Sequence, residues 1–224
     1  MRTVAVVPVK EKSDRVTSKN FREFHDGISL FEHKIRQLRT SGCFDAIYVS
    51  SDYEALKERQ AELGFIFLKR DPDYCTNVMP WSDVIHYVAS SLPENPGTNL
   101  AWCHTTSPLF NDYSACLRNY HEKVAEGEHD GLVSVKRVAE FLISEGGLPI
   151  NYGWGAWHRY SQHLPKVYAV NGALFVAKIG TMIENRYVIS RQPYFHEADD
   201  LSSVDVDTEL DFSYAQYLME QHQK

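Results

Sequence analysis

Two aspartates near the end of the chain have the types and the spacing of a cation site. Asp205 and Asp207 alternate with Val204 and Val206. If this segment is an extended strand, both carboxylates point to one side while both valines face the core. Paired carboxylates bind hard, oxygen-preferring cations such as Mg²⁺, whereas the alternative interpretation is a solvated, acidic strand end. Because the flanking valines disfavour simple exposure, we predict a Mg²⁺ site at Asp205 and Asp207.

The residues after this pair have the pattern of a helix start. Thr208 stands three residues before Asp211, and an apolar run comes next. This spacing is typical of a capping box, in which each residue's side chain satisfies the backbone N–H of the other. Glu209 and Asp211 also suit the positive end of a helix dipole. We therefore predict a structural role for these two carboxylates and a helix over about 208–219.

A second group of candidates lies in the loop after the first apolar run. Lys10, Lys12, Arg15 and Lys19 place four cations there. Cationic side chains and loop amides at the end of a strand suit a polyphosphate. The loop has no glycine, so it is neither of the two common glycine-rich phosphate-binding loops. On charge pattern alone, a phosphate site and a solvated surface loop are equally compatible with it.

Two further segments carry polar residues beside apolar runs. His104 and Thr106 follow one such run, and Asn171 and Gly172 precede another. An imidazole and a hydroxyl at a strand end can recognise a base or a ribose, but the Ser-Pro pair that follows can equally just start a turn. Asn-Gly is a common turn signal and by residue type means nothing more.

The elements that would position these residues alternate along the chain. Continuous apolar, β-branched runs are typical of strands buried on both faces, and apolar stripes at helical spacing separate them. This alternation predicts an α/β fold, a doubly wound and mostly parallel sheet. Ligands in such sheets bind beyond the carboxyl ends of the strands. We predict strands at about 4–9, 46–50, 65–68, 100–104, 131–135 and 173–176, and helices at about 31–41, 52–63 (capped by Asp52), 84–89, 113–125 and 208–219.

Length and charge exclude several classes of protein. The chain has 224 residues, which we interpret as one domain over 1–224 with an insertion at about 138–170, rich in glycine and aromatic residues. That insertion is compatible with a β-rich excursion, a substrate lid or a subunit contact. The net charge of −7 argues against nucleic-acid binding, which needs a basic face. The N-terminal apolar run is too short for a signal peptide, and no apolar stretch is long enough for a membrane span; we expect a cytoplasmic protein with no membrane partner.

Taken together, these segments resemble the CMP-sialic acid synthetases, or acylneuraminate cytidylyltransferases. The order and spacing match over nearly the whole chain. The resemblance implies an α/β nucleotidyltransferase fold of Rossmann-like type, the substrate CTP, the cofactor Mg²⁺, and a homodimer built through a small insertion. The matching segments are 7–20, 27–30, 43–45, 49–52, 106–109, 171–173 and 203–211.

The resemblance also implies roles for individual residues. It implies a catalytic role for Lys19 with the metal ligands Asp205 and Asp207. It places an asparagine near the sugar at Asn171. The nucleotide-binding set is Lys10, Lys12, Ser13, Lys19, Asn20, His104 and Thr106, and the substrate-binding set is Asn171, Gly172 and Phe175.

The chain departs from the family pattern in the nucleotide loop. Lys10 stands where the family usually has an arginine, so the charge is kept but the bidentate fork is lost. Asp14 and Arg15 replace the usual Lys-Gly, and Thr17 replaces a common proline. His104 stands where glutamine is usual.

Two arginines that serve the triphosphate and the acidic sugar in the family are also replaced. Ser161 and Ala169 stand at those positions. A carboxylate that leaves water needs a cation or several hydrogen bonds, so the replacements predict a different acid as acceptor. Cations that could substitute are Arg159, Lys166, Arg186 and Arg191; the aromatic residues Trp154, Trp157, Tyr160 and Tyr168 could instead form a more apolar pocket.

We therefore predict a cytidylyltransferase that transfers CMP from CTP to a sialic-acid-like nonulosonate or analogue and releases pyrophosphate. One alternative is a metal-dependent glycosyltransferase, because Asp205-Val206-Asp207 is also a DxD pattern. The position of the pair near the C-terminus and the cationic loop argue against it. The other alternative is a non-catalytic nucleotide-binding protein, which the altered loop and the missing arginines favour and the aspartate pair disfavours.

Overall fold

A seven-stranded sheet forms the centre of the computed structural model, which describes residues 1–13 and 16–222. Six strands are parallel, and β8 runs antiparallel to both of its neighbours. The predicted α/β fold with a mostly parallel sheet is confirmed, and the altered positions Asp14 and Arg15 lie outside the described residues. The strand order is β5 (Ile66–Lys69), β4 (Ala46–Ser51), β1 (Thr3–Pro8), β6 (Asn99–Cys103), β8 (Val167–Lys178), β7 (Gly131–Val138) and β9 (Pro193–Ala198).

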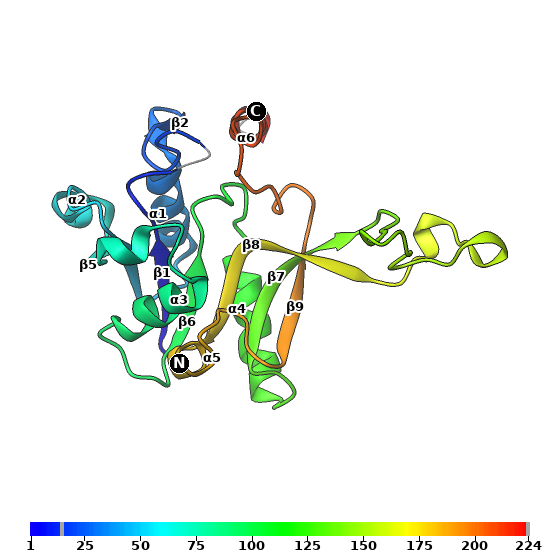
Figure 1. Ribbon diagram of the computed structural model, residues 1–224. Coiled ribbons are helices and arrows are strands. Elements are labelled where there is room, and N and C mark those ends of the chain that lie inside the picture. Colours follow the sequence, from blue (N-terminus) through cyan, green and yellow to red (C-terminus); the bar gives the residue numbers. More distant parts are fainter. Residues whose placement is uncertain (14–15, 223–224) are drawn as a thin grey trace.

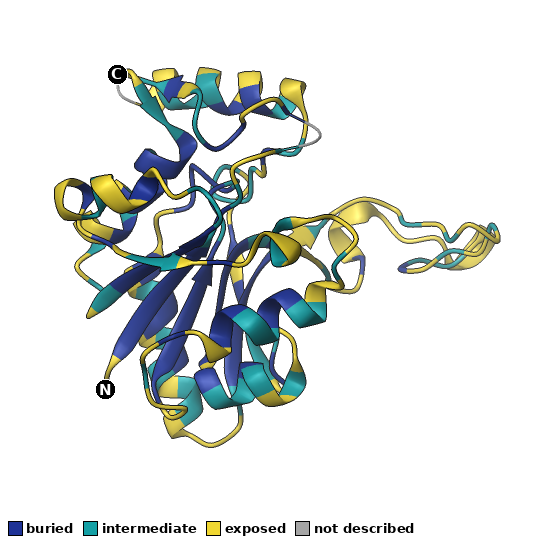
Figure 2. Cartoon of the chain, turned by 60° about the vertical axis from the view of Figure 1, so that its left-hand side comes forward, coloured by how far each residue is buried: buried dark blue, intermediate teal, exposed yellow. Residues whose placement is uncertain are grey.

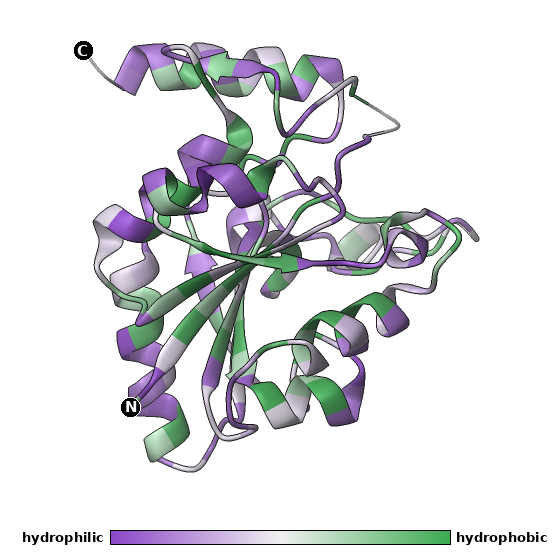
Figure 3. Cartoon of the chain, turned by 90° about the vertical axis from the view of Figure 1, so that its left-hand side faces the viewer, coloured by the Kyte–Doolittle hydropathy of each residue, from purple (hydrophilic) through white to green (hydrophobic). Residues whose placement is uncertain are grey.

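Helices cover both faces of the sheet (Figures 1 and 2). One core lies between the sheet and α1, α2 and α4, and a second lies between the sheet and α3 and α5. Figure 3 shows the hydrophobic residues along the strands and the hydrophilic ones on the outer helix surfaces. The helices are α1 (Leu30–Ser41), α2 (Leu56–Leu63), α3 (Trp81–Ser90), α4 (Tyr113–Ala125), α5 (Ile179–Asn185) and α6 (Glu209–His222), with a hairpin of β2 (Glu23–His25) and β3 (Ile28–Ser29) and three short 3₁₀ turns at Pro72–Cys75, Gly155–Trp157 and Ser161–His163. None of the helices within the described ranges has the length and hydrophobicity to span a bilayer.

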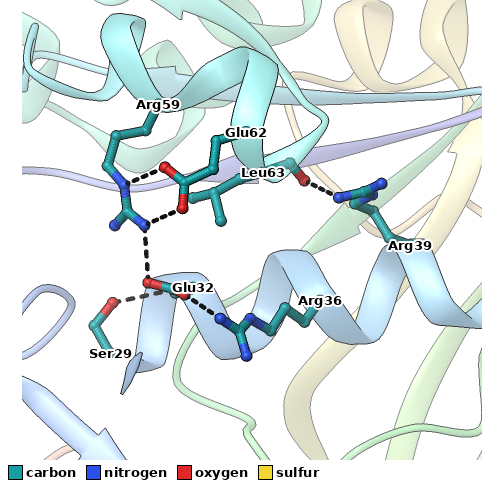
Figure 4. Close-up of polar contacts among 7 residues, drawn as sticks. All are labelled: Ser29, Glu32, Arg36, Arg39, Arg59, Glu62 and Leu63. Atoms are coloured by element: carbon teal, nitrogen blue, oxygen red, sulfur yellow. Dashed lines mark hydrogen bonds and ion pairs between the residues drawn. The ribbon is translucent and has the colours of Figure 1, made fainter. Parts of the chain in front are cut away.

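Local signals fix the ends of α1. The Ser29 hydroxyl accepts a hydrogen bond from the Glu32 backbone N–H, and Gly42 ends the helix at φ +63°, a conformation that favours glycine. The Glu32 carboxylate then binds both Arg36, one turn along α1, and Arg59 on α2 (Figure 4). This ion-pair cluster ties α1 to α2 on one side of the sheet.

Two local expectations are wrong. Asp52 does not cap α2: the helix begins at Leu56 without a side-chain cap, and the Asp52 carboxylate accepts a hydrogen bond from the Glu11 backbone N–H instead (2.9 Å). Asn171-Gly172 is not a turn between elements. It lies inside β8, where Gly172 has φ +73° and the pairing with β7 shifts register, so these residues form a bulge.

The segment 204–207 is not a strand, contrary to the expectation, and it pairs with no strand of the described sheet. Val206 is fully buried with Val16, Leu30 and Phe212, which is the core-facing role that the alternation predicts. The capping box that follows is confirmed. The Asp211 N–H donates to the Thr208 hydroxyl (3.2 Å), and the Asp211 carboxylate accepts from the Thr208 N–H (2.8 Å). Hydrophobic burial and a helix cap, rather than a strand ladder, hold the aspartates in place.

An arm formed by residues 139–166 projects from the sheet between β7 and β8 (Figure 1). Its base is the β7–β8 ladder, which ends at the pair Val138–Val167. The Asn151 side chain ties the two sides together, because it accepts from the Leu142 N–H and donates to the Glu140 carbonyl. Large apolar side chains exposed on the arm are Phe141, Ile143, Leu148, Ile150, Trp154, Trp157 and Tyr160.

Candidate nucleotide and metal site

A cavity of about 630 Å³ opens at the carboxyl edge of the parallel strands. The loops after β1, β5 and β6, the start of α3 and the segment 204–207 enclose it, as expected for a sheet of this type. The side chains around it are cationic, acidic, hydroxylic and aromatic. Its lining includes Lys10, Ser13, Lys19, Asn20, Arg70, Tyr74, Cys75, Asn77, Met79, Trp81, His104, Thr106, Asp205 and Asp207.

The two aspartates lie together at this cavity. Asp205 is exposed and lines the cavity, where the surrounding protein still removes much of its hydration. This desolvation, together with the charge of Asp207, raises the pKa of Asp205, while a hydrogen bond from Thr106 and the charge of Lys19 partly oppose the rise. The charge of Lys19 therefore offsets only part of the cost of placing two carboxylates together, and a further cation would stabilise the pair.

The residues present fit a magnesium ion. No group of three or more His, Cys, Asp or Glu side chains in residues 1–13 and 16–222 has the arrangement of a protein-only metal cage. Mg²⁺ does not require such a cage, because it commonly binds one or two carboxylates together with substrate phosphates and waters. Asp205 and Asp207 provide hard oxygen ligands at an open cavity, which matches that mode.

Lys19 links the cationic loop to the aspartates. Its ammonium is almost fully buried, donates to the Val206 carbonyl (2.7 Å) and lies 3.7 Å from the Asp207 carboxylate. Asn20, the next residue, is also buried; its amide donates to the Lys10 carbonyl and accepts from the Thr105 hydroxyl (2.7 Å). The end of the loop, Lys19 and Asn20, is therefore part of the cavity wall rather than a freely solvated surface.

The other loop residues divide into two groups. Lys10 and Ser13 line the cavity, and the Lys10 ammonium donates to the Asn77 amide oxygen (2.6 Å). Lys12 is exposed and is not among the lining residues, so the structure does not bring it to the cavity.

Arg70 is a cavity residue that the sequence analysis missed. It follows β5, is only 4% exposed, and donates to the Val9 carbonyl (2.9 Å) and to the Cys75 sulfur (2.9 Å). The signal that could have found it is its place: a cation directly after an apolar run that predicts a strand, at the same edge of the sheet as Lys10.

His104 lines the cavity as a neutral ring with a fixed tautomer. The Trp102 indole N–H donates to Nε2 of His104 (3.0 Å), and because an indole can only donate, that nitrogen holds a lone pair. Enclosure by the protein lowers the pKa of His104 to about 4, although a hydrogen bond with the Gly172 backbone opposes this. At neutral pH the Nε2 lone pair of His104 is therefore already occupied by the hydrogen bond from Trp102.

The predicted substrate residues lie beside the cavity but not in its lining. Asn171 is nearly buried; its amide donates to the Ser203 hydroxyl (3.2 Å) and accepts from the Ala173 N–H. Gly172 bonds to His104 through its backbone, and buried Phe175 packs edge-to-face on the His104 ring (centroids 5.9 Å apart). Gly172 and Phe175 therefore contact the His104 ring and help to fix its position.

The replaced arginine positions and their candidate substitutes are scattered. Ser161 is exposed on the arm, and Ala169 is exposed on β8. Arg186, beyond α5, pairs with Asp83 in the first turn of α3, and Arg191, just before β9, lies at the amino edge of the parallel strands. Arg159 borders an open hollow on the arm with Tyr160 and His163.

Comparisons with known proteins add an independent line of support. No protein-family model matches the chain. It is 25% identical over 219 residues to an N-acylneuraminate cytidylyltransferase from Streptococcus agalactiae, covering 95% of this chain and 52% of that protein, so it spans about half the length of that relative. It is 26% identical over 237 residues to a CMP-N,N'-diacetyllegionaminic acid synthase from Legionella pneumophila (100% and 99% covered) and 23% identical over 229 residues to a pseudaminic acid cytidylyltransferase from Campylobacter jejuni (97% and 96%).

A solved structure shares the fold. CMP:2-keto-3-deoxy-manno-octonic acid synthetase complexed with CTP superposes with a TM-score of 0.64 at 11% identity, covering 99% of this chain and 100% of that one. The sheet architecture is therefore shared with that synthetase. With sequence similarity and fold in agreement, the chain is a distant homologue, over nearly all of its length, of the N-acylneuraminate cytidylyltransferases and other nonulosonate cytidylyltransferases.

Proposed function

We propose that the protein is a CTP-dependent cytidylyltransferase that transfers CMP to a nonulosonic acid. An acceptor oxygen attacks the α-phosphorus of CTP, the bond from that phosphorus to the bridging oxygen breaks, and pyrophosphate leaves. The observation that carries the proposal is the cavity in which Asp205 and Asp207 lie beside Lys19, with Lys10 and Arg70 in the same wall. The relatives with nonulosonate cytidylyltransferase names support the same reaction.

The chain's own residues have separate tasks in this reaction. Lys10, Lys19 and Arg70 bind and orient the triphosphate through charge-assisted hydrogen bonds. Asp205 and Asp207 hold Mg²⁺. When bound, this ion neutralises charge that develops on the phosphoryl oxygens and on the leaving pyrophosphate. Catalysis then depends mainly on positioning and electrostatics, with no covalent protein intermediate.

His104 does not act as the general base in this scheme. Its Nε2 lone pair accepts the Trp102 indole N–H, and its pKa of about 4 makes the ring a weak proton acceptor. We infer that His104 shapes the wall of the cavity where the family usually has glutamine.

We also propose that the protein forms a homodimer through the arm. The arm carries exposed Trp157 and Tyr160 on a surface that projects away from the core, and such exposure favours an interface. Sedimentation equilibrium at micromolar concentration should yield about twice the chain mass of 25.7 kDa, and Trp157→Asp should shift it toward the monomer. A monomer for the unaltered chain would reject this assembly.

The acceptor is predicted to differ from N-acetylneuraminic acid. Ser161 and Ala169 supply no cation, Arg186 is engaged in an ion pair with Asp83, and Arg191 lies at the far edge of the sheet. Without a bidentate guanidinium, a carboxylate is held less tightly. We expect low turnover with N-acetylneuraminic acid and higher turnover with a related acid.

A pyrophosphate-release assay with CTP and Mg²⁺ tests both the reaction and the acceptor. The acids are sialic, legionaminic, pseudaminic and 3-deoxy-octulosonic acid, together with phosphonates. A preference for N-acetylneuraminic acid over all others would contradict the acceptor prediction. Binding of CTP without release in any reaction would favour a non-catalytic nucleotide-binding protein, and release of nucleoside diphosphate from a sugar nucleotide would favour a glycosyltransferase.

A further inference from the structure

A fully buried lysine outside the cavity has no task in the reaction described above. Lys34 lies on α1 with no exposed surface. Its ammonium donates to the Ser107 carbonyl (2.8 Å) and to the Tyr113 hydroxyl (2.8 Å). None of the carboxylates in the part of the chain that the structure describes forms an ion pair with it. Burial lowers the pKa of Lys34 to about 8, so the surroundings disfavour its charge.

Lys34 belongs to a set of α1 side chains that hold the loop after β6. His33 donates through Nε2 to the Pro108 carbonyl (2.9 Å), and the Gln37 amide donates to the same oxygen (2.6 Å). With the bond from Lys34 to Ser107, three neighbouring donors on one helix bind two consecutive carbonyls. The loop is therefore anchored to the body of the protein at its backbone.

This loop in turn holds the proposed metal and nucleotide residues. The Val206 N–H donates to the Thr106 carbonyl (2.8 Å), and the Thr106 side chain hydrogen-bonds to Asp205. The adjacent Thr105 hydroxyl donates to the Asn20 amide oxygen (2.7 Å). Because 204–207 pairs with no strand of the described sheet, these loop contacts replace a ladder as its polar support.

Packing alone does not explain a lysine at position 34. A methionine of similar length would fill the same space without desolvating a charge, so what the lysine adds is its hydrogen bonds to the Ser107 carbonyl and the Tyr113 hydroxyl. We propose that Lys34 is a positioning residue: by fixing the Ser107 carbonyl it holds Thr106, and through Thr106 it holds Asp205. Its effect on turnover rests on the proposed cytidylyltransferase function, whereas its effect on the loop does not.

The test compares Lys34→Met with Ile35→Val, a matched change of a buried α1 residue that faces the core under the sheet instead of the loop. In Lys34→Met we expect kcat to fall about tenfold or more and the Mg²⁺ concentration for half-maximal rate to rise, as for other residues that support metal ligands. The Kd for CTP measured without metal should stay within about twofold. Ile35→Val should keep kcat and the Mg²⁺ dependence.

A second readout does not depend on catalysis. The Val206 amide, which is bonded to the Thr106 carbonyl, should exchange with deuterium about tenfold faster in Lys34→Met and at the normal rate in Ile35→Val. An unchanged exchange rate overturns the proposal, and so does an unchanged kcat in an active enzyme. If the unaltered protein shows no turnover with any acid, the proposed function fails and amide exchange alone decides the role of Lys34. Should Lys34→Met not fold, the double variant Lys34→Met with Tyr113→Phe removes the orphaned hydroxyl and undergoes the same two measurements.

Discussion

Replacing Asp207 by asparagine is expected to lower kcat for CTP-dependent pyrophosphate release by about 100-fold or more. A neutral amide keeps the shape of the side chain but is a poor ligand for Mg²⁺. The fold should survive, because the Asp207 side chain is partly exposed. Its charge also raises the pKa of the neighbouring Asp205, so removing that charge relieves repulsion between the two carboxylates. The measurement is steady-state turnover at limiting Mg²⁺, with circular dichroism to check folding.

Asp211→Asn is the matched control for this variant. Asp211 stands four residues along the same segment, but its carboxylate accepts from the backbone N–H groups of Asp207 and Thr208 and from the Thr208 hydroxyl, and it is not among the cavity-lining residues. We expect a loss of about 1 kcal/mol or less in the free energy of unfolding, with most of the turnover kept. Normal turnover of Asp207→Asn at limiting Mg²⁺ would show that the metal site is assigned to the wrong residues.

Lys19→Ala should produce the second large loss, on the order of 100-fold in kcat/KM for CTP. The almost fully buried ammonium lies at the cavity, where a charge-assisted bond to a phosphate is strong. Its removal also deletes a charge that lowers the pKa of Asp205, so the carboxylate pair should bind a metal less well at slightly acidic pH. The kinetic constants for CTP at several pH values would show both effects.

Lys12→Ala provides the comparison from the same loop. Both residues are lysines, but Lys12 is exposed and is not in the cavity lining. We expect its effect on kcat/KM to be at least about tenfold smaller than that of Lys19→Ala. Equal losses in the two variants would mean that general loop charge, and not the placement of Lys19, attracts the nucleotide.

Much of the fold could be predicted because it depends on local patterns. The buried runs of β1 and β4 and the left-handed glycines Gly42 and Gly64 that end α1 and α2 are properties of short segments. Weak segments were missed for the same reason. The hairpin of β2 and β3 and the edge strand β9 contain short or mixed sequences that acquire strand structure only through a partner.

The sequence by itself determined the α/β class, the carboxylate pair, the capping box at Thr208 and the family resemblance, since each is a pattern of neighbouring residues or their order. Only the tertiary structure decided which cations share the cavity: Lys19 and Arg70 do, and Lys12 does not. It also decided that His104 is neutral and that Lys34 is buried. The physical reason is that these properties arise from contacts between residues far apart in the sequence, such as the bond from Lys19 to the Val206 carbonyl, 187 residues away. The local periodicity that predicts helices and strands does not depend on such contacts.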